Sequence, residues 1–209
     1  MGTFSDMTLA DFVRQAASDA PTPGGGGVAA LAGALGGAMA AMAANFTVGK
    51  PKFAEHDGLM RETLEALVPL IDSLRRAVDD DAAAFSGISE AYKLPRGDEA
   101  EKARRQEAIA AALTASMRVP LRVAEDCARA AELLPRLAET GNPNLLSDVE
   151  VAGIMLEAAA RAAEVNILVN SRSLKTDEAR AAEAEGRRAA ARTAEVAVRV
   201  RETVAGRNG

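Results

Sequence analysis

The sequence predicts an all-α fold, a single-domain bundle of long, partly kinked helices that covers residues 1–209. Apolar residues recur at steps of three and four over long stretches, as in Leu64, Leu67, Ile71 and Leu74, which is the spacing of one helix face. Aromatic residues make up only 3% and Trp is absent, whereas strands favour aromatic and β-branched residues. An alanine-rich chain of this length can bury one core through close contact between helices.

The first elements follow from local patterns near the N-terminus. Thr8 is expected to begin an amphipathic helix that buries one face and ends before Pro21; the apolar face consists of Leu9, Phe12, Val13 and Ala16. Residues 24–48 carry no charge, so the next helix, to about Phe46, is expected to be buried. Because Ala and Gly dominate this segment, we favour a helix of a soluble core over a membrane span.

The remaining helices are longer. Apolar residues continue from Leu64 to Tyr92 in a heptad-like seam, in which Pro69 predicts a kink or a restart. A fourth helix is expected over residues 98–138, with a kink at Pro120. After the break at 141–144, Ser147 and Glu150 predict a capping box. Thr176 is expected to cap a last charged helix that ends near residue 205.

Composition excludes several classes of function. The net charge of −5 argues against nonspecific nucleic-acid binding, which needs a basic surface. Cys127 is the only cysteine, so no intrachain disulfide can form and a cytoplasmic location is expected. Cys127 lies among alanines on a helical pattern, which favours a core residue over a nucleophile. With His56 as the only histidine and no Cys/His ligand spacing, we expect neither a metal nor another cofactor.

Asp81 is the most informative residue of the seam. The other seam members are apolar or aromatic, and burial of an unpaired carboxylate costs several kcal/mol, on the order of a lost ion pair. One interpretation is that Asp81 lines a pocket as an acid, a base or a ligand anchor, with a pKa raised by burial. The other is a structural Asp that pairs with an Arg or faces water. Asp79 and Asp80 lie off the seam and are expected to be solvated.

Four further segments carry candidate binding residues. The glycines at 24–27 can approach an anion closely at a helix N-terminus, or form a flexible connector. Lys50 and Lys52 can hold a carboxylate, or lie in a solvated turn. The segment from Asn142 to Asp148 combines turn and capping residues, and Asn166 and Asn170 share one helix face.

These segments, in order, resemble a known family. The matching stretches are Pro-Thr-Pro-Gly-Gly-Gly-Gly at 21–27, Asn-Phe-Thr-Val-Gly-Lys at 45–50, Asp-Ala-Ala-Ala-Phe at 81–85, Leu-Pro at 94–95, Val-Pro-Leu at 119–121, Gly-Asn-Pro-Asn at 141–144 with Ser147-Asp148, and Asn166 with Asn170. The chain is similar to the C-terminal domain of formiminotransferase-cyclodeaminases and to free-standing methenyltetrahydrofolate cyclohydrolases. The resemblance extends to about residue 171. It departs at Lys50-Pro51-Lys52-Phe53, where the family often has Lys-Lys-Lys-Tyr.

The resemblance implies a homodimeric, all-α enzyme that binds a one-carbon derivative of tetrahydrofolate. From charge and composition we expect no nucleic-acid or membrane partner. The resemblance further implies that Asp81 is the acid/base residue. It also implies a set of substrate-binding residues, which are Pro23, Gly24, Gly25, Gly26, Gly27, Asn45, Lys50, Lys52, Asn142, Asn144 and Asp148.

Three functions remain open from the sequence. The first is hydrolysis of 5,10-methenyltetrahydrofolate to 10-formyltetrahydrofolate, favoured by the Thr-Pro-Gly-Gly-Gly-Gly turn and by the lack of a formiminotransferase half in these 209 residues. The second is a formimidoyltetrahydrofolate cyclodeaminase, which releases ammonia. The third, of another class, is a non-catalytic folate-binding or structural helical dimer. Both reactions need one group that moves protons at a tetrahedral carbon and a site that fixes the pterin.

Overall fold

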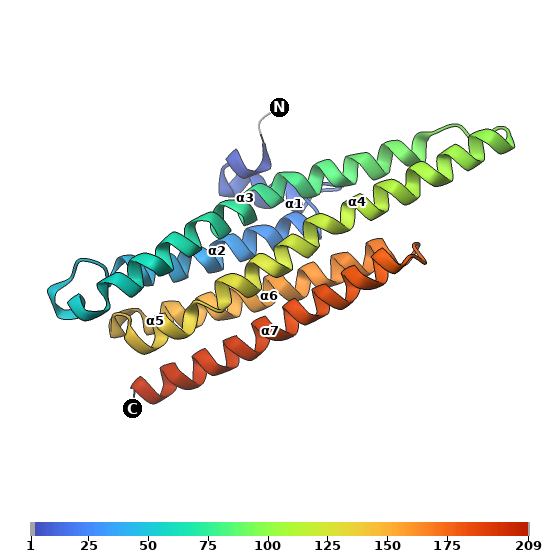
Figure 1. Cartoon of the computed structure of the whole chain (residues 1–209). Coiled ribbons are helices and arrows are strands. Elements are labelled where there is room, and N and C mark those ends of the chain that lie inside the picture. Colours follow the sequence, from blue (N-terminus) through green and yellow to red (C-terminus); the bar gives the residue numbers. More distant parts are fainter. Residues whose placement is uncertain (1–2, 209) are drawn as a thin grey trace.

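The computed structural model describes residues 3–208, and these form helices with no strand (Figure 1). The predicted all-α class is therefore confirmed. The elements in chain order are η1 (Phe4–Asp6), α1 (Leu9–Ala16), α2 (Gly25–Asn45), η2 (Pro51–His56), α3 (Asp57–Lys93), α4 (Glu99–Ala131), α5 (Leu134–Thr140), η3 (Pro143–Leu145), α6 (Leu146–Ser171) and α7 (Asp177–Asn208). The long helices α2, α3, α4, α6 and α7 run side by side in one bundle.

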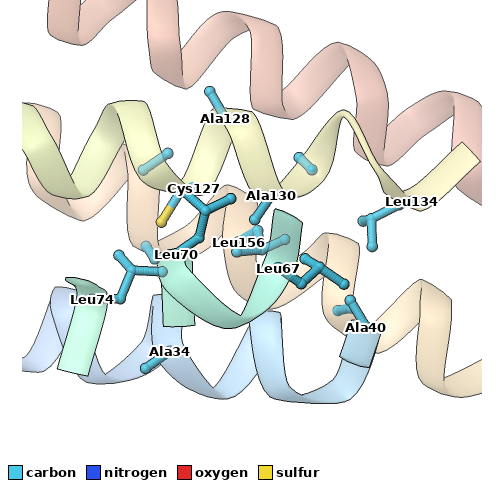
Figure 2. Packing of buried hydrophobic residues seen from close by; sticks show 14 of the residues in the cluster. Ala34, Ala40, Leu67, Leu70, Leu74, Cys127, Ala128, Ala130, Leu134 and Leu156 are labelled. Carbon is cyan, nitrogen blue, oxygen red and sulfur yellow. The ribbon is translucent and has the colours of Figure 1, made fainter. Parts of the chain in front are cut away.

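Helix α2 packs against both α3 and α6, which are its main neighbours in the bundle. Its glycines allow this close contact: a Cβ built at Gly33 would lie 2.8 Å from the Sγ atom of Cys127, and one at Gly37 would lie 2.8 Å from Cγ1 of Ile71. The neighbouring core consists of alanines and leucines from α2, α3, α4 and α6 (Figure 2). Burial thus accounts for the absence of charge from most of α2, as the sequence predicts, whereas Val28 and Leu35 are uncharged but exposed.

The glycine contacts also fix the direction of the neighbours. Positions 26, 33 and 37 of α2 meet positions 81, 74 and 71 of α3, and positions 25 and 36 meet positions 166 and 156 of α6. Both neighbours therefore run antiparallel to α2. As a result, the middle of α3 and the C-terminal half of α6 lie beside the N-terminus of α2.

Helix α3 is continuous through Pro69, and α4 is continuous through Pro120, so neither proline interrupts its helix. The seam on α3 is buried in its first part and exposed in its second part. Leu67, Leu74 and Val78 are buried, whereas Phe85 and Tyr92 are exposed. The reason is visible in Figure 1, where the hairpin of α3 and α4 extends beyond the other helices. The heptad-like pattern therefore continues along α3 after Asp81, where its residues Phe85 and Tyr92 no longer pack into the core.

Several predicted boundaries and faces need correction. The fourth helix ends at Ala131, and α5 restarts with Pro135 in its first turn, a position that proline favours. The capping box at Ser147 is wrong, because α6 begins at Leu146 without a side-chain cap. The apolar face of α1 buries only Phe12, and Leu9 and Val13 are exposed. The predicted caps at Thr8 and Thr176 are confirmed, because their hydroxyl oxygens accept hydrogen bonds from the backbone N–H groups of Asp11 and Ala179.

By length and composition, α2 is the one helix of the described chain apolar enough to cross a membrane. More than half of its most apolar window is buried inside the bundle.

Candidate active site

The Asp81 carboxylate lies where the middle of α3 passes the first turn of α2. Its Oδ2 atom accepts a hydrogen bond of 2.9 Å from the backbone N–H of Gly27. This N–H is one of the free donors at a helix N-terminus, and the N-cap residue Gly24 has no side chain to satisfy it. Asp81 therefore caps α2 from another helix while it remains half-buried.

The close contact between these two helices requires glycine at position 26. A Cβ built there would lie 2.0 Å from the Oδ1 atom of Asp81 and 2.5 Å from its Cγ atom, far inside van der Waals contact. The glycines of this turn thus serve close approach and not a left-handed backbone, since the one glycine with positive φ in residues 3–208 is Gly49. They belong to an ordered helix start, so the flexible-connector alternative is wrong.

Burial raises the pKa of the Asp81 carboxyl above its ordinary value of 3.8, and the N–H of Gly27 opposes this shift only in part. Within residues 3–208 Asp81 has no ion pair, and Arg122 pairs with the adjacent Asp80. The structural alternative of an Asp81–Arg pair is therefore not what the chain forms. A half-buried carboxylate with a raised pKa has the properties of a general base.

The two preceding carboxylates, which the sequence predicts to be solvated, both have partners in the structure, although Asp80 stays about half exposed. Asp79 accepts hydrogen bonds from the backbone N–H groups of Phe4 (2.6 Å) and Ser5 (3.4 Å) and so anchors the N-terminal segment on α3. Asp80 pairs with Arg122 on α4. Three consecutive aspartates thus bind three different elements, a division that helical spacing of side chains permits but that the sequence does not reveal.

Three more residues complete this end of the bundle. Pro23 is buried and follows a cis peptide bond. A Cβ built at Gly25 would lie 3.6 Å from both side-chain polar atoms of Asn166. The Nδ2 of Asn166 donates to the carbonyl oxygen of Ala162 at 2.8 Å. The structure therefore brings Asn166 to the glycine turn, a position that the sequence does not indicate.

The other predicted binding residues lie at the opposite end of α2. Asn45 is its last residue. The backbone N–H of Asn142 donates to the Thr47 hydroxyl at 3.0 Å, and the Asn142 side chain donates to the carbonyl oxygen of Phe46 at 3.3 Å. The side-chain oxygen of Asn142 also accepts from the N–H of Asn144 at 3.1 Å. The buried Thr47, which sequence reasoning passed over inside the 45–50 motif, thus joins two of the motifs.

Lys50 and Lys52 are exposed beside this junction. Lys50 lines a cavity of about 310 Å³ together with Gly49, Pro51, Ala54 and Asp57. Lys52 holds its Nζ atom 5.6 Å from the centre of the Phe53 ring. Asp148 lies in the first turn of α6 nearby. We call the group of Asn45, Lys50, Lys52, Asn142, Asn144 and Asp148 the lysine end, and that of Pro23, Gly24–Gly27, Asp81 and Asn166 the aspartate end.

The two ends are far apart within one subunit. Helix α2 contains 21 residues, which gives a separation of about 30 Å at 1.5 Å per residue. In Figure 1 the loop after α2 and the α5 region lie at one end of the bundle, and the start of α2 lies near α1 and the middle of α3. The single pocket that the sequence suggests is therefore divided between two places.

Other residues offer few chemical alternatives. Within residues 3–208 there is no group of three or more His, Cys, Asp or Glu side chains that could hold a metal. Cys127 is fully buried, and burial raises the pKa of its thiol strongly, which disfavours the reactive thiolate. A cavity of about 340 Å³ between α4 and α7 is lined by Met117, Leu121 and Glu125, among others, and not by Asp81.

Comparison with known proteins gives a consistent result. The model of the formiminotransferase-cyclodeaminase family matches residues 8–190. The chain is 39% identical over 167 residues to a methenyltetrahydrofolate cyclohydrolase from Methylorubrum extorquens, covering 80% of each chain. It is 37% identical to formimidoyltransferase-cyclodeaminase from Mus musculus, covering 82% of this chain and 32% of the mouse protein. A solved formiminotetrahydrofolate cyclodeaminase from Thermotoga maritima superposes with a TM-score of 0.85 and 30% identity, covering 96% of this chain and 97% of that one.

Proposed function

This chain belongs to the formiminotransferase-cyclodeaminase family, and from that premise we propose that it hydrolyses 5,10-methenyltetrahydrofolate to 10-formyltetrahydrofolate. The observation that carries the proposal is the Asp81 carboxylate, which burial makes more basic and the N–H of Gly27 holds in place. The similarity to a methenyltetrahydrofolate cyclohydrolase over 80% of both chains supports this reaction. We propose no metal or other cofactor for it.

Hydrolysis requires one group that moves a proton beside an electrophilic carbon. The methenyl carbon joins N5 and N10 and shares their positive charge. A water molecule attacks this carbon, and the Asp81 carboxylate accepts one of its protons as the C–O bond forms. The neutral adduct then breaks its bond to N5: the oxygen becomes a carbonyl and releases its second proton, and the proton held by Asp81 passes to N5. One water is consumed and one proton is released for each product.

The geometry around Asp81 fits this role. Oδ2 is fixed by the Gly27 N–H, so the carboxylate keeps a constant direction, and Oδ1 lies against Gly26, where a side chain would collide with it. A base that is held in place loses little entropy on reaching the transition state. The absence of a Cβ at position 26 therefore lets the carboxylate lie close to the first turn of α2.

A second candidate is the cyclodeaminase reaction, which the likeness to the Thermotoga maritima cyclodeaminase favours. In that reaction N10 attacks the formimino carbon and the imino nitrogen leaves as ammonia after it gains protons, which produces the methenyl compound. Asp81 would then accept the N10 proton and pass it to the leaving nitrogen, which takes one further proton from solvent to depart as ammonia. Both reactions therefore use the same residue on the same carbon.

A parallel assay separates the two. Purified protein is given the methenyl and the formimino substrates at one pH near neutrality, and the rates are corrected for spontaneous hydrolysis of the methenyl compound. We expect hydrolysis to be the faster enzymatic rate. A faster release of ammonia would replace the cyclohydrolase assignment with the cyclodeaminase, and the absence of both rates would refute the proposed chemistry.

We propose further that the protein is a homodimer. Helix α2 carries Val28 and Leu35 at exposed positions seven residues apart, and α6 carries Val151, Ile154 and Val165 on its exposed side. Exposed apolar stripes on two neighbouring helices are typical of an interface between subunits. Light scattering at micromolar concentration should give twice the chain mass of 21.6 kDa, and Leu35→Lys should shift it toward the monomer.

We propose that the dimer is soluble in the cytoplasm and does not bind nucleic acid. The apolar residues of α2 are covered by α3, by α6 and, in the proposed dimer, by a second copy of the chain. The net charge of −5 disfavours nucleic-acid binding. Fractionation of cells that produce the protein should leave it in the soluble fraction, and recovery with membranes would contradict this assignment.

A further inference from the structure

The N-terminal part of the chain begins and ends on the same turn of α3. We call residues 4–27 the N-terminal arm. At its start the backbone N–H of Phe4 donates to Oδ1 of Asp79 at 2.6 Å, and in Figure 1 this start lies against α3. At its end the N–H of Gly27 donates to Oδ2 of Asp81 at 2.9 Å. Two aspartates that are two residues apart therefore close the arm into a ring.

Polar contacts hold the first turn of the arm on α3. The N–H of Ser5 donates to the same Asp79 oxygen at 3.4 Å, and Nη1 of Arg75 donates to the Ser5 hydroxyl at 3.2 Å. Apolar packing is incomplete here, because a cavity of about 190 Å³ lies between the arm and α3, lined in part by Phe4 and Val78. Hydrogen bonds to a carboxylate are stronger than those between neutral groups, so Asp79 is the main attachment of this end.

The other end of the arm reaches Asp81 through a second set of contacts. On α1, Nε2 of Gln15 donates to the carbonyl oxygen of Thr22 at 3.2 Å, which joins α1 to the turn before α2. Pro23 of this turn is buried, and a Cβ built at Gly27 would lie 3.6 Å from the Cβ atom of Pro23. A displacement of α1 would therefore be felt by the residue that donates to Asp81.

Between its two ends the arm is lightly packed. Helix α1 has eight residues and buries only Phe12, whereas Leu9 and Val13 are exposed. A helix of this length is marginal by itself, so its position depends on the attachments at both ends. Release of the Asp79 end would leave the glycine turn held from one side only.

The charge of Asp79 does not explain the properties of Asp81. The pKa of Asp81 is raised by burial and lowered by the N–H of Gly27. The two aspartates are two residues apart on α3, a spacing at which helix side chains do not face each other. An effect of Asp79 on the chemistry at Asp81 would therefore pass through the arm.

We propose that Asp79 is a positioning residue for the reaction at Asp81. By binding the first turn of the N-terminal arm, it closes the ring that holds the glycine turn and the N–H of Gly27 against the Asp81 carboxylate. The proposal rests on the proposed role of Asp81 in proton transfer. The family model begins at residue 8, so the N–H donors at the start of the arm lie outside the part of the chain that it matches.

Two pairs of variants test this role from both sides of one hydrogen bond. Asp79→Ala removes the acceptor, and Asp79→Asn keeps an oxygen that can accept from Phe4. Phe4→Pro removes the donor at the first residue of η1, where a helical φ suits proline. The preceding Thr3 has the extended backbone that proline requires, with φ −74° and ψ 156°. Phe4→Leu keeps the N–H and is the matched control.

Asp79→Ala and Phe4→Pro should each lower kcat about tenfold, the scale of one hydrogen bond to a charged group, with little change in KM. Asp79→Asn and Phe4→Leu should stay within about threefold of wild type. The double variant Asp79→Ala/Phe4→Pro should be no slower than Asp79→Ala, because both changes remove the same bond. A normal kcat for Asp79→Ala or Phe4→Pro, an Asn variant as slow as the Ala variant, or multiplied losses in the double variant would overturn the proposal.

Urea titration shows whether each variant is folded under the assay conditions. If Asp79→Ala unfolds, the comparison of Phe4→Pro with Phe4→Leu makes the same test without a change on α3. Normal kcat in a folded Phe4→Pro enzyme would then refute the positioning role.

Hydrogen exchange at Gly27 separates this proposal from the function on which it rests. In protein labelled with [¹⁵N]glycine, NMR should show that the Gly27 amide exchanges about tenfold faster or more in Asp79→Ala and Phe4→Pro than in wild type. The amide of the buried Gly36 should not change. Unchanged exchange at Gly27 would overturn the positioning role even if kcat fell. Faster exchange, in a protein whose wild type converts neither folate substrate, would refute the proposed function and still support the ring that Asp79 closes on Asp81.

Discussion

The two ends of α2 use polar residues in different ways. At the aspartate end a carboxylate is drawn into the bundle, with one backbone N–H as its partner and a raised pKa. At the lysine end Asn142 and Thr47 satisfy backbone groups of the chain, and the cations remain at the surface. The first arrangement is costly for stability and useful for proton transfer, whereas the second fixes a loop and leaves charge available to a ligand. The comparison predicts that the aspartate end governs turnover and that the lysine end governs affinity.

The sharpest test of this division is Asp81→Asn, with the largest expected effect. The amide keeps an acceptor for the N–H of Gly27 but cannot take the proton of water, so kcat should fall by about a hundredfold or more, and KM should change little. Steady-state kinetics with the methenyl substrate measure both values.

The matched control for that variant is Asp80→Asn. It removes only an ion pair with Arg122 whose partners are both exposed, and such pairs contribute about 1 kcal/mol or less to stability. Its turnover should stay near wild type. Equal losses in the two variants would show that negative charge on this turn of α3, and not a base at position 81, supports the reaction.

Gly26→Ala tests the same end through geometry alone. The added Cβ would overlap the Asp81 carboxylate at 2.0 Å, so the carboxylate must move, and a displacement of this size costs roughly tenfold to a hundredfold in rate. Gly87→Ala on α3 is the control, because nothing lies within 4 Å of its Cβ; it should stabilise the helix by about 0.5–1 kcal/mol and keep its activity. A Gly26→Ala enzyme with normal kcat would exclude the close approach as a catalytic requirement.

The lysine end should show a smaller effect of another kind. Lys50→Ala/Lys52→Ala removes two surface cations, so KM should rise about tenfold, the value of one charge-assisted hydrogen bond, with kcat nearly unchanged. Lys93→Ala/Lys102→Ala is the control, since these lysines pair with Glu90 and Glu99 on the distant hairpin. A change in kcat instead of KM would break the proposed division between the two ends.

The sequence predicts the helices and the importance of Asp81 because both depend on local pattern. Periodicity defines α3 and α4, the uncharged run of Ala and Gly defines α2, and a single carboxylate on an apolar seam identifies position 81. The glycine run is also informative, although its reason, a collision between position 26 and Asp81, requires the antiparallel contact of α2 with α3.

The errors arise where a residue's partner lies far away in the chain. No local pattern indicates that the backbone N–H groups of Phe4 and Ser5 bind Asp79. Nor does any local pattern indicate that α3 extends past the bundle and leaves Phe85 exposed. Ser147 has the spacing of a capping box, but η3 already turns the chain into α6 and leaves Ser147 inside the helix. Helix register also determines that the candidate binding residues fall into two groups, which no local motif could indicate.

The smallest expected effect is the pH dependence that Asp81 gives to stability and rate. Burial raises its pKa in the folded protein above the ordinary 3.8, so the folded state favours the protonated form. The resulting stabilisation is fully present below the unfolded pKa and is lost as pH rises through the folded pKa. Asp81→Asn has no such loss. The free energy of unfolding of Asp81→Asn minus that of wild type should therefore be larger at about pH 7 than at about pH 4.5 in urea titrations.

The raised pKa of Asp81 also affects the rate. The kcat/KM of wild type should decline on acidification at a higher pH than an exposed aspartate would give. A stability difference that is constant with pH, together with a rate that declines only near 3.8, would mean that the Gly27 N–H compensates fully for burial and that Asp81 is no stronger a base than an aspartate on the surface.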